Sequence, residues 1–326
     1  MQNTLRNRCA SRTVHASYVP AQFLEAFAMF HCRSLRLMFI AALILTFSLP
    51  AFAGHGHEDA PAKKGILLVA FGTSVPEARV ALDNINEEVA KAFPDTEIRW
   101  AYSAAMIRNK IKRTENKVIP SPAAALAQMG DDGFTHVAVQ SLHTIPGQEF
   151  SDIKKTASAF DGIPKSISHI SVGTPLLNTP ADLAAMAEIL PATVPAARKK
   201  NEAVIFMGHG THDPGNIYYP GLATYLQEKD SNIFVGTVEG YPSLDSIIPT
   251  LKAKGIKKVW LMPLMSVAGD HARNDMAGSE EDSWKSILTK KGFKVTTVLK
   301  GTGEYDAIVA QWVAHLKTAF NALESH

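Results

Sequence analysis

Short apolar runs alternate with segments of helical periodicity along most of this chain. Runs rich in Val, Ile and Leu are typical of strands that are buried on both faces, whereas apolar residues spaced three or four apart are typical of helices. The first half predicts strands at 65–71, 96–102, 135–142 and 167–173, and helices at 76–93, 121–133 and 150–160. Strands that alternate with helices indicate a parallel sheet with helices on both faces.

The second half repeats this order. It predicts strands at 202–208, 231–238, 257–264 and 293–299, and helices at 242–255 and 306–323. The segment "LVAFGTS" of the first half matches "IFMGHGTH", and "AVQSLHTIPGQEF" matches "VWLMPLMSVAGDHA". We therefore predict an α/β protein made by internal duplication, with two similar domains at 64–195 and 196–326, each a parallel sheet flanked by helices.

Residues 1–53 have the pattern of a secretory signal peptide with an upstream lead. Two arginines precede the apolar run "LMFIAALILTFSLPAFA", whose Ala-Phe-Ala end fits a signal-peptidase site. The apolar core is too short for a comfortable membrane span. We predict cleavage after Ala53, a flexible mature N-terminus at 54–63, and a periplasmic protein with no stable membrane anchor. Translation could also start at Met29 or Met38.

This processing changes the charge of the chain. The formal net charge is +2, but the first 53 residues hold five arginines and one glutamate. The remaining 28 basic and 30 acidic residues give a net charge of −2, which argues against a nucleic-acid partner. Both cysteines, Cys9 and Cys32, also lie in the removed part. A metal site in the mature protein would therefore use histidine and carboxylate ligands.

Three side chains that can ligate a metal follow successive strands of the second half. His209 lies at a strand end in "MGHGTHD", Glu239 follows the next strand, and His271 follows the third. Neighbouring parallel strands end at the same edge of a sheet, about 5 Å apart, so these side chains can converge. Two histidines and a glutamate suit a first-row divalent cation with open coordination positions. The alternative is a polar network at the sheet edge.

The matching positions in the first half are Phe71, Ala104 and Glu149, of which only Glu149 can ligate a metal. A structural role alone would not require this difference between the halves. The difference favours a metal site in the second half, with the first half shaping the space for a ligand. Phe71 is expected to present an apolar face to that ligand or to the packing between the domains.

Three further residues lie close to these positions in the sequence. Asp270 precedes His271 and could orient its imidazole ring, or could cap the helix that follows. His212 could line the site or ligate the metal, and is otherwise a surface loop residue. His143, which matches Met265 of the other repeat, is expected to line the same site from the first half.

The segments "GHGTH", "VEGYPS" and "PLMSVAGDHARNDMAG", together with "LVAFGTS", resemble the anaerobic cobalt chelatases of cobalamin biosynthesis, which are relatives of ferrochelatase among the class II chelatases. The resemblance covers residues 64–322 and implies two α/β domains with a tetrapyrrole cleft between them. It also implies that His209, Glu239 and His271 bind the metal, and that His209 accepts a proton. The signal peptide is a departure, because typical members of this family act in the cytoplasm.

The resemblance implies an enzyme of the lyase class, a sirohydrochlorin cobaltochelatase. Such an enzyme inserts Co²⁺ or Fe²⁺ into the metal-free tetrapyrrole and releases two protons. Ni²⁺ and Zn²⁺ accept the same ligands, so the ligand types leave the metal open. The alternative is an exported carrier of a tetrapyrrole, of haem or of a metal that keeps the same fold. The signal peptide favours the carrier, and the intact set of three ligands favours the enzyme. The sequence leaves homo-oligomerisation open.

Overall fold

The computed structural model describes residues 62–324, which lie within one compact unit. The predicted signal peptide and the predicted flexible stretch up to residue 61 lie outside the described residues. Within residues 62–324, no helix has the length and the apolar character needed to cross a membrane.

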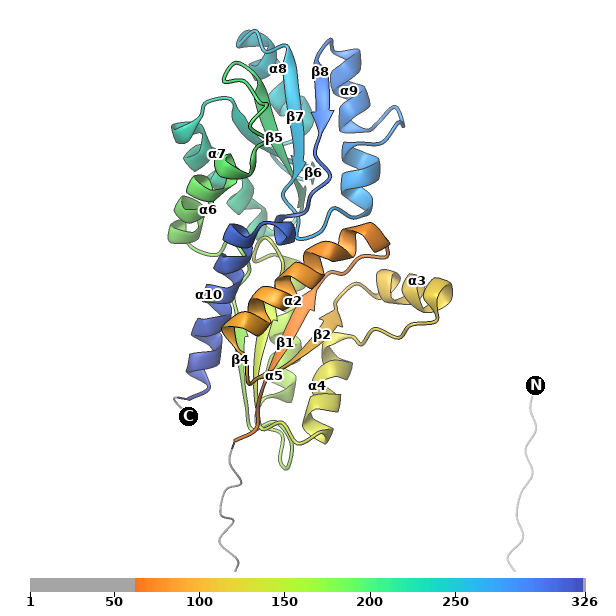
Figure 1. The fold of residues 1–326 in the computed structure, drawn as a ribbon, viewed down its shortest axis with the longest axis vertical. Coiled ribbons are helices and arrows are strands. Elements are labelled where there is room, and N and C mark those ends of the chain that lie inside the picture. Colours follow the sequence, from red (N-terminus) through yellow and green to blue (C-terminus); the bar gives the residue numbers. More distant parts are fainter. Residues whose placement is uncertain (1–61, 325–326) are drawn as a thin grey trace, which may run out of the picture. The chain divides into compact units, whose positions relative to one another are not determined.

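Two parallel four-stranded sheets form the framework of the described part (Figure 1). The first sheet has the order β2-β1-β3-β4 and the second has the order β6-β5-β7-β8. These orders are equivalent once each strand is matched to its repeat, so the prediction of two similar parallel sheets is confirmed. The strands are β1 (Lys64–Ala70), β2 (Glu97–Tyr102), β3 (His136–Ser141), β4 (His169–Gly173), β5 (Ala203–Gly210), β6 (Ile233–Glu239), β7 (Lys258–Pro263) and β8 (Lys294–Thr297).

Helices connect the strands in both halves. The first half contains η1 (Pro76–Arg79), α2 (Val80–Ala92), α3 (Ala105–Glu115), α4 (Pro122–Asp131), α5 (Gln148–Phe160) and α6 (Pro180–Thr193). The second half contains η2 (Pro214–Ile217), α7 (Tyr218–Lys229), α8 (Leu244–Ala253), the π-helical turn η3 (Ala272–Met276), α9 (Trp284–Lys290), η4 (Thr302–Glu304) and α10 (Asp306–Ala322). The sequence predicted α2, α4, α5, α8 and α10 but not α3, α6, α7 or α9.

Both faces of the first sheet are covered, which explains the continuous apolar run of β1. Ile66 and Leu68 pack in one cluster with side chains of α2 and α10. Leu67 and Val69 point to the opposite face and pack with side chains of α4 and α5. All four side chains are fully buried. Burial of each such side chain stabilises the fold by about 1.5–3 kcal/mol, so neither helix layer is dispensable.

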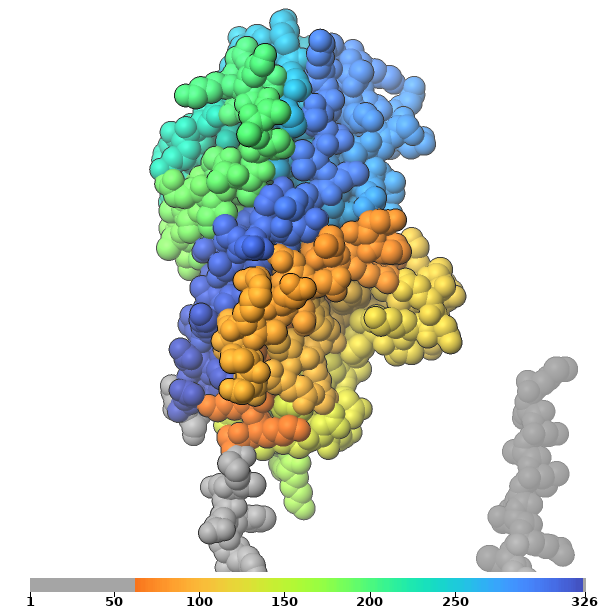
Figure 2. All heavy atoms as spheres, in the orientation of Figure 1, coloured from red at the N-terminus to blue at the C-terminus, as the bar shows by residue number. Residues whose placement is uncertain are grey.

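The last helix of each half packs on the other half. The sequence placed the 306–323 helix with the second half, but α10 packs on β3, β4 and α2 of the first half. The dark-blue α10 lies directly against the orange α2 in the space-filling view (Figure 2). In return, α6 follows β4 and packs on α7. His315 of α10 also lies 3.1 Å from Asp182 of α6, measured from Nε2 to Oδ1. The domain limits 64–195 and 196–326 stay a prediction.

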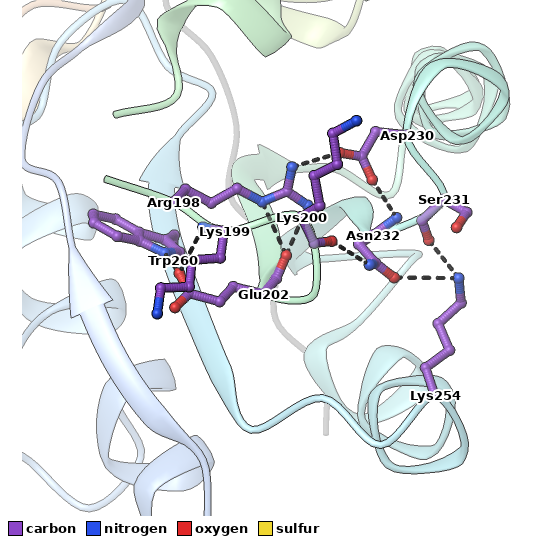
Figure 3. A network of polar contacts seen from close by, with 9 residues as sticks. All are labelled: Arg198, Lys199, Lys200, Glu202, Asp230, Ser231, Asn232, Lys254 and Trp260. Atoms are coloured by element: carbon purple, nitrogen blue, oxygen red, sulfur yellow. Dashed lines mark hydrogen bonds and ion pairs between the residues drawn. The ribbon is translucent and has the colours of Figure 1, made fainter. Parts of the chain in front are cut away.

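A network of polar contacts anchors the connection between the halves (Figure 3). The Arg198 guanidinium donates to the Glu202 carbonyl oxygen at 2.7 and 2.9 Å and lies 2.5 Å from Oδ2 of Asp230. Trp260 donates from Nε1 to the Glu202 carboxylate at 2.7 Å. Burial alone would raise the pKa of Asp230, but the bonds from Arg198 and the Asn232 backbone hold this pKa below its usual range. These residues lie toward the amino ends of β5, β6 and β7, away from the predicted metal ligands, which indicates a stabilising role.

Candidate functional site

The three predicted metal ligands lie at the carboxyl ends of strands, as the sequence indicated. His209 is the penultimate residue of β5, Glu239 is the last residue of β6, and His271 follows β7 as the helical residue directly before η3. The strand arrows of the two sheets point toward each other in Figure 1. The carboxyl ends of both sheets therefore lie toward the junction of the two halves, where ligands bind in open α/β sheets.

The glycines around His209 are required by close packing. A Cβ atom at Gly208 would lie 2.3 Å from the Tyr219 ring, and one at Gly210 would lie 1.5 Å from the backbone oxygen of Glu239. Gly210 also has φ +81°, which residues with a Cβ rarely adopt. The "GHG" segment therefore lets the tip of β5 pass closely between a buried aromatic ring and β6, with the His209 side chain at the strand end.

His209 and His271 lie beside each other. Their ring centroids are 4.6 Å apart and the ring planes are nearly perpendicular, at 87°. Both side chains are half-buried. Two imidazoles held at this separation can present nitrogen atoms to one small cation.

Each imidazole has a hydrogen-bond acceptor at Nδ1. In His209, Nδ1 lies 2.9 Å from the Gly210 carbonyl oxygen, and in His271 it lies 2.5 Å from Oδ2 of Asp275. A carbonyl or a carboxylate can only accept, so each Nδ1 carries the proton when the ring is neutral. The lone pair of both rings then lies on Nε2, which is the nitrogen that can bind a metal or accept a proton.

Glu239 is not gathered with the two histidines. It is exposed, and its register partner on β5 is Gly210 rather than His209. Because side chains alternate along a strand, this register directs Glu239 away from the His209 side chain. Within residues 62–324, no group of three His, Cys, Asp or Glu side chains is placed to hold a metal ion together. The structure thus brings together two of the three predicted ligands.

Asp270 does not have either of its predicted contacts. Its Oδ1 accepts a hydrogen bond from the Asn274 side chain at 3.0 Å, and it caps no helix because the turn that follows starts after His271 without a side-chain cap. The carboxylate that orients His271 belongs to Asp275, which the sequence placed nearby without a role. The π-helical turn determines which acid reaches the ring, and no simple spacing rule predicts such a turn.

His143 lies in the buried loop after β3. Its Nδ1 is 3.0 Å from the Ser141 hydroxyl, and burial lowers its pKa to about 4. Its buried Nε2 has no hydrogen-bond partner among the described residues, and the nearest carboxylate oxygen, of Glu149, is 3.9 Å away. The imidazole is therefore neutral at physiological pH, on the first-half side of the junction.

Loops from the two halves touch around these residues. Thr144 is the residue after His143, and its hydroxyl donates a hydrogen bond to the Leu264 carbonyl oxygen at 3.4 Å. Thr73, just after β1, packs against Gly269, two residues before His271. The segments that follow β1 and β3 thus contact the segment that follows β7.

The other predicted residues have simpler surroundings. His212 is exposed, and no hydrogen bond or ion pair of its side chain occurs among the described residues. Phe71 is 37% exposed at the end of β1, so it presents an apolar surface rather than a packed core side chain. Tyr219 is buried, and desolvation raises its pKa to about 12 against the opposing effect of backbone hydrogen bonds from Gly210 and His209. Tyr219 therefore packs against the segment that carries His209 and holds it in place.

Known proteins are similar to this chain over most of its length. The family model described as cobalt chelatase (CbiK) matches residues 64–321. The chain belongs to the cobalt chelatase family. The sirohydrochlorin cobaltochelatase CbiKC of Nitratidesulfovibrio vulgaris is 42% identical over 265 residues, which cover 80% of this chain and 92% of that protein. The sirohydrochlorin cobaltochelatase of Salmonella typhimurium is 35% identical over 260 residues, which cover 79% of this chain and 97% of that protein.

Solved structures share the fold of this cobalt chelatase family member. SirB from Bacillus subtilis with Fe³⁺ has a TM-score of 0.52 at 17% identity, covering 81% of this chain and 98% of that chain. DR2241 from Deinococcus radiodurans, described as structurally similar to chelatases, has a TM-score of 0.54 at 14% identity, covering 78% of this chain and 54% of that chain. The predicted resemblance to the cobalt chelatases is confirmed, and so is the chelatase-like fold.

Proposed function

We propose that this protein is a sirohydrochlorin cobaltochelatase, an enzyme that inserts Co²⁺ into the metal-free tetrapyrrole with release of two protons. The observation that carries the proposal is the pair of imidazoles, His209 and His271, held 4.6 Å apart with Nε2 as the available nitrogen of each. The activity named for both curated relatives supports the same reaction. The carrier alternative has no such support.

The chemistry explains why two adjacent imidazoles suit this reaction. Insertion requires loss of two pyrrole protons and exchange of the water ligands of the metal. A neutral histidine accepts a proton near physiological pH, and we assign this role to His209. A site with few protein ligands can hold the substrate metal and release it to the ring. We assign Glu239 as the third ligand, which requires its exposed side chain to turn from its present direction toward the histidines. This ligand set also admits Fe²⁺, Ni²⁺ and Zn²⁺.

The reaction can be tested directly. Purified protein is mixed anaerobically with metal-free sirohydrochlorin and Co²⁺, and insertion is followed by the absorbance of the ring. We expect the protein to accelerate insertion over the uncatalysed rate, and His209→Ala and His271→Ala to abolish the acceleration without changing the circular dichroism spectrum. His212→Ala, at an exposed position, is the matched control and should stay active. Full activity of both site variants would show that the site is assigned wrongly.

We further propose that the mature protein acts outside the cytoplasmic membrane. The support is the arginine-flanked apolar run and the Ala-Phe-Ala end in residues 1–53. N-terminal sequencing of the protein from a periplasmic extract should find a terminus directly after Ala53. A terminus at Met29 or Met38 in the cytosolic fraction would contradict export. The absorbance spectrum of the same preparation tests for bound haem.

A further inference from the structure

Helix α3 starts beside the candidate site. It follows β2 by two residues, and the Ala104 backbone N–H just before it donates to the Phe71 carbonyl oxygen at 3.3 Å. Phe71 in turn precedes Thr73, which packs against Gly269 near His271. The first turn of α3 is therefore connected to the His271 segment through the single short loop after β1. Figure 2 shows α3, in yellow, projecting from the side of the first half.

Both ends of α3 are fixed by arginine side chains. At its start, the Arg108 guanidinium donates to the backbone oxygens of Tyr102 and Ser103, both at 2.6 Å. At its end, Glu115 forms a two-pronged ion pair with Arg79. The Glu115 charge is thus paired with Arg79, and the Arg108 guanidinium is directed toward backbone oxygens. These contacts also hold a helix that buries one side chain, Ile111, in a defined position.

The remaining cations of α3 have no acidic partner. Lys110, Lys112 and Arg113 are exposed, and none of them forms an ion pair with another residue of 62–324. Three cations without an acidic partner next to a substrate site create a local positive electrostatic potential. Such an arrangement attracts an anionic ligand rather than stabilising the fold.

The cations lie on two different flanks of the helix. Met106, Lys110 and Arg113 are spaced i, i+4 and i+7, so they share one flank, which we call the α3 strip. Lys112 lies on the other flank, with Arg108 and Glu115 at i−4 and i+3. The α3 strip begins with Met106, whose side chain is 71% exposed and which lies two residues after Ala104, the backbone partner of the exposed Phe71.

The geometry points to the α3 strip as the recognition element for the carboxylate groups at the edge of the tetrapyrrole. This inference rests on the proposed function, because it takes a polycarboxylate tetrapyrrole as the substrate. Met106 and Phe71 contact the apolar body of the ring, and Lys110 and Arg113 pair with its peripheral carboxylates. With a rise of about 1.5 Å per residue, the cations lie about 6 and 10 Å along the helix from Met106. These separations suit a flat ring with acidic side chains at its rim.

The experiment compares charge reversals on the two flanks. Lys110→Glu, Arg113→Glu and the control Lys112→Glu change the net charge equally, so they alter the long-range field alike and differ in direct contact. Binding of metal-free sirohydrochlorin is followed by fluorescence titration. We expect each strip variant to raise the dissociation constant about 10-fold or more, as loss of a charge-assisted pair does, and Lys112→Glu to change it less than about 3-fold. Circular dichroism confirms the fold of each variant.

Two further measurements separate this inference from the proposed function. A porphyrin whose carboxylates are blocked as methyl esters should bind strip variants and wild type with nearly equal affinity, and Co²⁺ affinity should be unchanged. Equal weakening by all three substitutions, or no weakening by the strip variants, would overturn the assignment. If the wild type binds sirohydrochlorin in the expected pattern but does not insert Co²⁺, the proposed reaction fails while the α3 assignment stands.

Discussion

The Nδ1 atom of His271 lies 2.5 Å from Oδ2 of Asp275, one turn further along the chain. The carboxylate accepts the Nδ1 proton, orients the ring and leaves Nε2 for the metal. Such a partner also makes the imidazole a stronger ligand, since it offsets the positive charge that the ring acquires on metal binding. Asp275 is thus a positioning residue for His271, a role for which the sequence alone offered Asp270.

Replacement of this acid should weaken metal binding. We expect Asp275→Asn to lower the affinity for Co²⁺ by about 10- to 100-fold, because an amide can present its N–H group to Nδ1 and allow the wrong tautomer. Calorimetric titration with Co²⁺ measures the affinity. Asp270→Asn is the matched control, since Asp270 contacts Asn274 and not His271, and it should bind Co²⁺ as the wild type does. Equal effects of the two substitutions would contradict the assignment.

The strands and their repeat could be predicted because buried parallel strands leave a strong apolar pattern. The contacts of the site depend on features that leave no such pattern. The pair of His271 and Asp275 requires a local π-helical turn, and the position of Glu239 depends on a register in which it faces Gly210. Helix α3 was missed because it carries few apolar residues and buries only Ile111, so its apolar face is too sparse to stand out in the sequence.

The sequence also could not predict which sheet α10 packs on. Its amphipathic pattern predicts a helix with one buried face, but both sheets offer an apolar face to cover. The apolar pattern is the same for either sheet, so only the folded structure shows that α10 returns to β3 and β4. A duplicated protein has this ambiguity at each closing helix.

The two halves should contribute differently to binding. Glu239→Ala should weaken Co²⁺ binding and leave affinity for the metal-free ring nearly unchanged, because a carboxylate offsets the charge of the cation. Phe71→Ala should instead weaken ring binding, since the 37% exposed side chain presents apolar surface. The loss of stability should be below the roughly 3–5 kcal/mol of a fully packed aromatic residue. Separate titrations with Co²⁺ and sirohydrochlorin measure both effects. The roles would be reversed if Phe71→Ala removed Co²⁺ binding and Glu239→Ala did not change it.

The polar network at the start of the second sheet should carry stability but no activity. Arg198→Ala should lower the free energy of unfolding by about 3 kcal/mol, because it leaves the part-buried Asp230 without its cation. Urea denaturation measures this value. Lys229→Ala removes an exposed ion pair with Glu188 and should cost less than about 1 kcal/mol. Co²⁺ affinity should be unchanged in both variants, and a loss of Co²⁺ affinity in Arg198→Ala would show that the network also shapes the site.

His143 should make the protein sensitive to mild acid. Burial lowers its pKa from 6.5 to about 4, so the unfolded chain binds a proton near pH 6.5 while the folded protein resists protonation until about pH 4. Protonation therefore favours the unfolded state, and the free energy of unfolding falls as the pH decreases through this window. The shift corresponds to a loss of up to about 3 kcal/mol, all of which is regained above pH 6.5.

Two asparagine variants test this pH dependence. His143→Asn keeps a polar group near the Ser141 hydroxyl but cannot take up the proton, so its stability should change less between pH 7 and pH 4 than that of the wild type. The measured quantity is the difference in unfolding free energy between the two pH values, which does not depend on any constant loss caused by the substitution. His212→Asn, at an exposed histidine, should keep the full pH dependence of the wild type. If His143→Asn lost as much stability as the wild type between pH 7 and pH 4, the acid sensitivity would come from groups other than His143.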